Sequence, residues 1–192
     1  MSSGATLSPH DMRILIACEY SGIVRDAFIR RGHRAVSCDL LPTESPGPHL
    51  TCDVLKILGD GWDMMIARPP CTHIAVSGAA WFDRKRRDGS QQKAVEFFMA
   101  IANAPIPKIA VENPVCIMST VWRKPDQIIQ PWMFGHPEQK ATCLWLKNLP
   151  TLDPTHNVKT EIMQLPLKER QRLYYLPPSP DRWKERSKTF RG

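Results

Sequence analysis

The sequence lacks several features that would assign it to a specialised class of protein. Among its 192 residues, no apolar run reaches the ~20 residues that a membrane-spanning helix requires. The N-terminal segment MSSGATLSPHDMR has neither the positively charged start nor the apolar block of a secretion signal. No internal repeat or low-complexity tract is present. These absences favour a globular protein that stays inside the cell, with no role in a membrane.

The six cysteines also lack the spacing of a disulfide framework or a zinc site. They occur singly, without a CxxC pair, so we expect them to be reduced thiols. Cys71 and His73 could both bind a metal ion, but no second pair with zinc spacing follows, and we expect no metal site. We interpret five of the six as small buried apolar residues, with Cys18 and Cys38 inside strands. Cys71 is the exception.

The net charge is positive, at +7, which favours a polyanionic partner such as nucleic acid. Two clusters carry much of this charge. The segment DRKRRDG, residues 83–89, contains four consecutive cations, and we expect a loop there that contacts phosphate. Eight further cations lie between residues 168 and 191, where a solvated tail is an equally good interpretation.

Strand-like and helix-like segments alternate along the chain. Apolar runs predict strands over residues 13–18, 34–42, 62–70, 108–114 and 141–150. Helical spacing predicts helices over 21–33, closed by Gly32, and over 90–104, with Ser90 as the N-cap; Asp53 precedes a short helical turn. The alternation predicts an α/β fold with a mostly parallel sheet. We expect one domain over 1–192, with a core over about 12–150 and an irregular, basic, proline-rich segment over 151–192.

Polar side chains gather at the predicted carboxyl ends of these strands, where α/β sheets bind ligands. The prolines before Cys71 end a strand and leave the thiol in a loop, where it could attack an electrophilic carbon. Glu112 could protonate a ring nitrogen, and the amide of Asn113 could hold an exocyclic group. Acidic residues after the early strands suit the hydroxyls and amino group of a nucleoside. Together these groups suggest chemistry on a pyrimidine ring with a nucleoside-bearing cofactor.

Each of these residues also has a purely structural interpretation. Glu112 and Asn113 could cap the turn into Pro114. Asp39 and Asp53 could be ordinary turn or cap residues. Trp81 and Phe82, just before the cation run, could stack on a base, although anchoring the loop in the core is the favoured interpretation.

The order RILIACEYSG, CDL, CDV, RPPC, VENP and FGHPEQKAT resembles that of the DNA cytosine-5 methyltransferases, which use S-adenosylmethionine. It is most similar to short phage-type members without a target-recognition domain, and the resemblance spans residues 13–150. It implies a Rossmann-like methyltransferase fold with DNA as the partner, in the cytoplasm of a bacterial or phage-infected cell. The residues that it implies for binding the cofactor are Glu19, Ser21 and Gly22 at the methionine part, Asp39 at the ribose, Asp53 at the adenine amino group, and Pro69.

The resemblance also implies a catalytic mechanism. Cys71 would add to C6 of cytosine, Glu112 would protonate N3, and Asn113 would support Glu112. The activated C5 would then take the methyl group, after which its proton and Cys71 would leave. The residues implied for substrate contact are Pro70, Arg84, Arg86, Arg87, Lys140 and Thr142, with Lys85 in the same DNA-closing loop.

Four features depart from the family pattern. The cofactor loop keeps only Gly22 where the family has several glycines. The Gln-x-Arg-x-Arg element is replaced by Glu138, Lys140 and Thr142, so only one cation remains. No insert is long enough for a target-recognition domain, so sequence selection would be weak or supplied by a protein partner. The sequence ends at SKTFRG, where the family continues into a helix that closes the cofactor site.

Other functions remain open from the sequence. RPPC is also similar to the Pro-Pro-aromatic motif of amino-group methyltransferases, although Arg68 and Cys71 occupy its polar and aromatic positions. A free pyrimidine nucleotide could replace DNA as the substrate. A degenerate methyltransferase could survive as a DNA-binding or partner-binding protein, which the altered loops favour and the retained thiol and Glu-Asn pair oppose.

Overall fold

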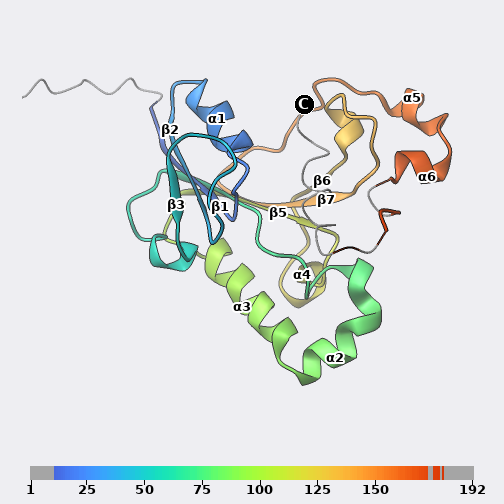
Figure 1. Ribbon diagram of the computed structural model, residues 1–192, viewed down its shortest axis with the longest axis horizontal. Coiled ribbons are helices and arrows are strands. Elements are labelled where there is room, and N and C mark those ends of the chain that lie inside the picture. Colours follow the sequence, from blue (N-terminus) through green and yellow to red (C-terminus); the bar gives the residue numbers. More distant parts are fainter. Residues whose placement is uncertain (1–10, 173–174, 178, 180–192) are drawn as a thin grey trace, which may run out of the picture.

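The computed structural model describes residues 11–172, 175–177 and 179, and its centre is one seven-stranded sheet. The strand order is β3-β2-β1-β4-β5-β7-β6 (Figure 1). The strands are β1 (Arg13–Ala17), β2 (Arg34–Asp39), β3 (His49–Thr51), β4 (Met64–Ala67), β5 (Lys108–Pro114), β6 (Gln127–Ile129) and β7 (Thr142–Lys147).

Short helices connect these strands. The α-helices are α1 (Ile23–Ile29), α2 (Phe82–Arg87), α3 (Ser90–Ala102), α4 (Met118–Val121), α5 (Lys159–Met163) and α6 (Leu167–Arg170). The 3-10 turns are η1 (Val54–Lys56), η2 (Val76–Trp81) and η3 (Pro131–Met133). No helix in the described ranges has the length and apolar character needed to cross a membrane.

The sheet confirms the predicted α/β class, because β1 to β5 all run parallel and only β7 is antiparallel to its neighbours. From β1 the chain builds outward through β2 and β3, then returns to place β4 on the other side of β1. This reversal makes a Rossmann-like switch point between β1 and β4, which opens a crevice at their carboxyl ends. The fold therefore favours a ligand site beside the ends of β1 and β4.

Strand β1 is buried on both faces, as its unbroken apolar sequence predicts. Ile14 and Ile16 pack in a cluster with Val24 and Phe28 of α1. Leu15 belongs to the larger cluster, in which α3 packs against the opposite face. Figure 1 shows α1 and α3 on the two sides of the sheet. Because both faces are covered, the functional groups are confined to the strand ends.

Several local expectations from the sequence are wrong, concerning the ends of elements, one helix and the exposure of one side chain. Cys18 lies beyond β1 in a left-handed conformation with φ of 58°, not inside the strand. Ser90 is the first residue of α3 rather than its N-cap; its N–H donates to Asp88 at 2.9 Å. Hydrogen bonds from the Ser90 side chain, and after it from this N–H, lower the pKa of Asp88. The cations at 84–87 lie on α2 and not on a loop. Trp81, which we expected in the core, is 60% exposed.

The C-terminal third contains more regular structure than its prolines predict. Helices α5 and α6 fall within the segment 151–192, which we expected to be irregular. Arg172, just after α6, donates to the buried carboxylate of Glu138 at 2.6 Å, and Gln139 N–H donates to the Arg170 carbonyl. These bonds attach the end of α6 to the segment before β7. The cations between 182 and 191 lie outside the described residues.

A buried arginine organises the chain around the start of α1. The side chain of Arg25 is fully buried, and its donors reach one carboxylate, two hydroxyls and two backbone carbonyls: Asp26, Ser37, Thr43, Ser45 and Pro46. The hydrogen bond from Arg25 lowers the pKa of Asp26. The guanidinium thereby joins α1 to β2 and to the loop that precedes β3.

Gly22 is required beside this guanidinium for two reasons. Its φ is +76°, and a Cβ at this position would lie 2.5 Å from Arg25 Nη2. Arg25 cannot move away without losing its buried hydrogen bonds. Gly32, which closes the turn after α1 as predicted, has a similar φ of +86°, but no atom lies within 4 Å of the corresponding Cβ.

The two glycines make a matched test of this packing. We expect Gly32→Ala to lower the free energy of unfolding by about 1 kcal/mol, from backbone strain alone. Gly22→Ala should cost roughly 3 kcal/mol, because it adds displacement of Arg25. Urea unfolding of both variants measures the difference. Equal losses would show that the contact with Arg25 does not constrain Gly22.

Candidate active site

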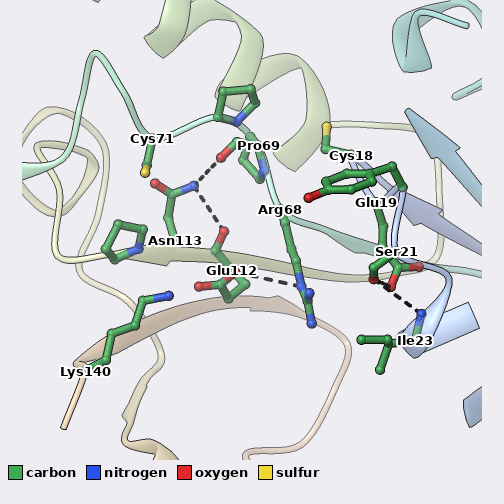
Figure 2. A pocket seen from close by; sticks show the side chains of 13 residues that line it. Cys18, Glu19, Ser21, Ile23, Arg68, Pro69, Cys71, Glu112, Asn113 and Lys140 are labelled. Carbon is green, nitrogen blue, oxygen red and sulfur yellow. Dashed lines mark hydrogen bonds and ion pairs between the residues drawn. The ribbon is translucent and has the colours of Figure 1, made fainter. Parts of the chain in front are cut away.

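A pocket of about 310 Å³ lies at the carboxyl ends of β1, β4 and β5 (Figure 2). This volume is at the lower end of the range for small-molecule sites. Because β7 is antiparallel, the segment leading into it reaches the same edge and contributes Lys140. The lining residues are Cys18, Glu19, Tyr20, Ser21, Ile23, Arg68, Pro69, Pro70, Cys71, Glu112, Asn113, Pro114 and Lys140.

The exit of β4 is held by a side chain from the neighbouring strand. Arg68 N–H donates to the Ala17 carbonyl at 3.1 Å, but the two prolines that follow have no N–H to continue the ladder. Asn113 replaces that link: its Nδ2 donates to the Pro69 carbonyl at 2.8 Å and to the Glu112 carbonyl at 3.1 Å. Asn113 thus ties β5 to the corner before Cys71, instead of capping the turn into Pro114.

Cys71 faces the pocket from a fixed backbone position. Its carbonyl accepts the N–H groups of Ile74 and Ala75, at 3.1 and 2.9 Å, which closes the turn that follows. The thiol is partly exposed and lies on the same side of the pocket as the Asn113 amide (Figure 2). A thiol held in this way can meet a planar ring that enters the pocket.

The loop after β1 forms the opposite wall. Glu19 is almost completely buried, and its Oε1 accepts the Ser21 hydroxyl and the Val24 N–H, both at 2.9 Å. This carboxylate stabilises the first turn of α1, where a negative charge is favourable. The left-handed Cys18 turns the chain from the strand into this wall, and such conformations of non-glycine residues concentrate at functional sites.

Two buried polar atoms on these walls have no hydrogen-bond partner among the described residues. They are Oε2 of Glu19 and Oδ1 of Asn113. Buried acceptors are rarely left without a donor, so each fits a ligand that supplies one. A carboxylate oxygen suits a cationic amino group, such as that of S-adenosylmethionine. The residues present therefore fit this cofactor at the Glu19 wall.

Asp39 and Asp53 lie beside the pocket without lining it. Asp39 ends β2 and accepts the Leu41 N–H at 3.0 Å, while Asp53 caps η1 by accepting the Leu55 N–H at 3.0 Å. Their structural interpretations as turn and cap residues are thus correct for one oxygen of each carboxylate. The negative charges of both carboxylates raise the pKa of Cys18, which lines the pocket, so both carboxylates lie close to it.

Cys18 is the second thiol in the pocket, and its environment disfavours the thiolate. Burial, followed by the charge of Asp39 and with a smaller contribution from Asp53, raises its pKa to about 12. Burial likewise raises the pKa of Cys38 to about 12 and that of Cys116 to about 11. These three cysteines stay protonated at neutral pH, as expected of small buried residues.

Glu112 and Arg68 form the floor between the two walls. Oε2 of Glu112 lies 3.9 Å from Nε of Arg68, and the side chains are 25% and 45% exposed. The interpretation of the sequence did not assign Arg68 to the site. Its position directly before the Pro-Pro-Cys corner is the signal that could have identified it. The sequence analysis also missed four lining residues that are close in sequence to assigned ones: Cys18, Tyr20, Ile23 and Pro114.

The other assigned residues lie outside this pocket. Gly22 lies against the buried Arg25 guanidinium. The Thr142 hydroxyl donates to the Lys140 carbonyl at 3.3 Å. The arginines of α2 are exposed and do not reach the lining; Arg86 pairs with Asp83. Lys85 donates to the Thr72 carbonyl at 2.6 Å, which fixes α2 beside the turn after Cys71. In the described part of the chain, no metal-binding group of acidic, histidine or cysteine side chains occurs.

The sequence matches no protein-family model and no curated protein. Among solved structures, a similar chain is a protein described as a DNA modification methyltransferase, encoded within a prophage of E. coli. The two are 14% identical with a TM-score of 0.47. The alignment covers 71% of this chain and 46% of that one, so this chain spans less than half of its length. The chemical assignment of the pocket therefore depends on its own residues.

The buried link from Asn113 can be tested against an exposed counterpart. Asn148 also donates to a proline carbonyl, that of Pro107, at 2.8 Å. We expect Asn113→Asp to cost about 3 kcal/mol of stability at neutral pH, because a buried carboxylate would face two carbonyls. Asn148→Asp should cost less than about 1 kcal/mol. The measurement is the urea midpoint of each variant as a function of pH. The loss of stability in Asn113→Asp should become smaller in acid, because the protonated carboxyl group can again donate a hydrogen bond. Equal, pH-independent deficits would contradict the buried link.

The high pKa of Cys18 can be tested by alkylation. With a pKa of about 12, Cys18 should be spared by iodoacetamide at neutral pH. Its rate should rise roughly tenfold for each pH unit while the protein stays folded, because only the thiolate reacts. Peptide mass spectrometry reports each cysteine separately, and Cys38 is the internal control for the same behaviour. Rapid alkylation of Cys18 near neutrality would contradict this assignment.

Proposed function

We propose that this protein is an S-adenosylmethionine-dependent methyltransferase that transfers a methyl group to C5 of cytosine in DNA through a covalent adduct with Cys71. The observation that carries the proposal is the meeting of Cys71, Glu112 and Asn113 in one pocket, opposite a wall with a buried carboxylate oxygen that has no partner in the described part of the chain. A thiol, a carboxyl group and an amide on one side suit a pyrimidine. The opposite wall suits the cofactor.

The reaction follows from these positions. The Cys71 thiolate forms a bond to C6, and the ring electrons move toward N3, where Glu112 delivers a proton. Asn113 holds the segment that carries Glu112 and the corner that carries Cys71. C5 becomes nucleophilic and would take the methyl group of the bound cofactor, whose sulfonium sulfur would keep the electron pair of the broken bond and leave as a neutral thioether. Loss of the C5 proton to a base then expels Cys71, and N3 returns its proton to Glu112, so the ring, the carboxyl group and the thiolate are all restored.

The cofactor would lie along the ends of β1, β2 and β3. The free oxygen of Glu19 suits the amino group of the methionine part, with Ser21 and Gly22 shaping that wall and Pro69 opposite. The hydrogen bond to each of Asp39 and Asp53 occupies one carboxylate oxygen, which leaves the other for the ribose hydroxyls and the adenine amino group. This assignment uses the order of strands at the switch point.

DNA is the proposed partner because exposed cations lie next to the pocket on α2. Arg84, Arg86 and Arg87 are exposed, and Lys85 holds their helix against the turn that follows Cys71. Phosphate contacts of this kind position a duplex without reading its sequence. Pro70, Lys140 and Thr142 would contact the target base or its flanks. Sequence selection would be weak or supplied by a protein partner, in the cytoplasm of a bacterial or phage-infected cell.

A covalent trap tests this function. The protein is incubated with labelled S-adenosylmethionine and DNA containing 5-fluorocytosine, in which fluorine replaces the hydrogen that must leave. We expect a stable, labelled protein–DNA adduct on a denaturing gel. Cys71→Ser should abolish it, because serine does not supply the thiolate. Cys52→Ser is the matched control, since it removes a thiol that does not line the pocket, and it should retain the adduct.

The same experiment separates the other functions. Absence of an adduct despite cofactor binding would refute the covalent mechanism. Methyl transfer that survives Cys71→Ser would indicate amino-group chemistry. An adduct with the free 5-fluorocytosine nucleotide but not with DNA would change the substrate class. Failure to bind the cofactor would favour a protein that only binds DNA or a partner.

A further inference from the structure

Lys140 reaches the pocket from a segment that belongs to neither of its two walls. This lead-in segment, residues 138–141, precedes β7, and the lysine side chain lies on the Glu112 side of the pocket (Figure 2). The Lys140 N–H donates to Oε1 of Gln130 at 2.9 Å, and its carbonyl accepts the Thr142 hydroxyl at 3.3 Å. Side-chain contacts therefore determine where Lys140 lies.

The lead-in segment begins with a buried charge. The side chain of Glu138 is 7% exposed, and its Oε1 accepts Nη2 of Arg172 at 2.6 Å and Nε of Arg172 at 3.2 Å. Its Oε2 is also buried and has no hydrogen-bond partner among the described residues. Within those residues, Arg172 is the cation that pairs with this buried carboxylate. Hydrogen bonds between two charged groups are among the strongest side-chain contacts.

This ion pair connects the lead-in segment to the C-terminal helices. Arg172 follows α6, and beside the ion pair the Gln139 N–H donates to the Arg170 carbonyl at 2.7 Å. Helices α5 and α6 lie together beyond the β6 side of the sheet (Figure 1). The start of α5 is attached in turn to η3, because the Val158 N–H donates to the Trp132 carbonyl at 2.9 Å. These helices therefore contact the lead-in segment while lying outside the pocket.

We propose that Arg172 is a positioning residue for the pocket, which acts by holding Glu138 and with it the segment that carries Lys140. This inference rests on the function proposed above, in which Lys140 contacts the target base or its flanks. Two residues of extended chain span about 7 Å at most, so a displacement of Glu138 also displaces Lys140. The end of α6 thereby takes part in building the pocket without lining it.

The energetics of a buried ion pair give this link its strength. Removal of one partner leaves the other as an uncompensated charge, which costs far more than the pair contributes while it is intact. Without Arg172, the Glu138 carboxylate gains by moving toward water, and the lead-in segment moves with it. A lysine would keep the positive charge but would lose the two donors of the guanidinium that meet Oε1. The conservative variant should therefore preserve the position in part.

Hydrogen exchange tests the position of the lead-in segment without any substrate. Arg172→Ala should speed exchange of the Gln139 and Lys140 amides by roughly tenfold, because their hydrogen bonds open more often, and should leave β4 and β5 unchanged. Lys168→Ala is the matched control: it removes an exposed cation from α6 itself, and exchange should stay as in the wild type. Unfolding midpoints establish that each variant is folded.

Adduct formation with 5-fluorocytosine DNA tests the consequence for the pocket. Arg172→Ala should lower the maximal rate on the order of tenfold, because small misplacements of a contacting group are costly, and Lys140→Ala should lower it by a similar factor. Arg172→Lys should recover part of the rate, and Lys168→Ala should keep all of it. The double variant should be no slower than Lys140→Ala alone, because Arg172 acts through Lys140.

Three results would overturn this inference while the proposed function stands: unchanged exchange in Arg172→Ala, an unchanged rate in that variant, or additive losses in the double variant. Additive losses with a reduced salt dependence of binding would mean that Arg172 contacts a DNA phosphate directly. A wild type that forms no adduct overturns the proposed function and the role of Lys140 in it. The exchange measurement then still decides whether Arg172 holds the lead-in segment.

Discussion

The hydrogen bond between the Asn113 amide and the Pro69 carbonyl is the link on which the arrangement of the pocket depends. Two prolines end the ladder of β4, so the corner that leads to Cys71 has no backbone donor to hold it. Asn113, buried at the end of β5, supplies that donor at 2.8 Å. Because Glu112 precedes it in the same strand, the one amide sets the position of both the thiol corner and the carboxyl group. Within the described ranges, its own oxygen is buried and has no hydrogen-bond partner.

The opposite wall is built on a different principle. There a buried carboxylate, Glu19, closes the first turn of α1 with one oxygen, while its other oxygen meets no donor from the residues that the structure describes. Behind it, the guanidinium of Arg25 uses its donors to join α1, β2 and the following loop, and Gly22 gives it space. One wall is thus fixed by an amide between strands and the other by charged groups around a helix end. The switch point between β1 and β4 brings the two walls together.

Much of the fold could be predicted because its signals are local. Unbroken apolar runs located β1, β2, β4, β5 and β7, and the alternation with helices predicted a parallel sheet. The three-residue strands β3 and β6 were missed, because so short a segment carries no periodicity and pairs only where a neighbour offers an edge. Helix α2 was expected as a loop because its four consecutive cations leave no periodic spacing of apolar residues that would indicate a helix. The conformation of Cys18 was missed because a left-handed turn of a cysteine leaves no trace in the sequence.

The same division applies to the site. The sequence by itself determined the reactive groups, because the thiol after two prolines and the Glu-Asn pair after an apolar strand can be read directly from the order of residues. It also determined that parallel strands would carry them to one edge. Only the tertiary structure decided which groups share the pocket, because that depends on strand order and on the antiparallel β7, which brings in Lys140. It excluded the arginines of α2 from the lining and placed Arg68 at its centre, because packing and not sequence spacing determines where a long side chain lies.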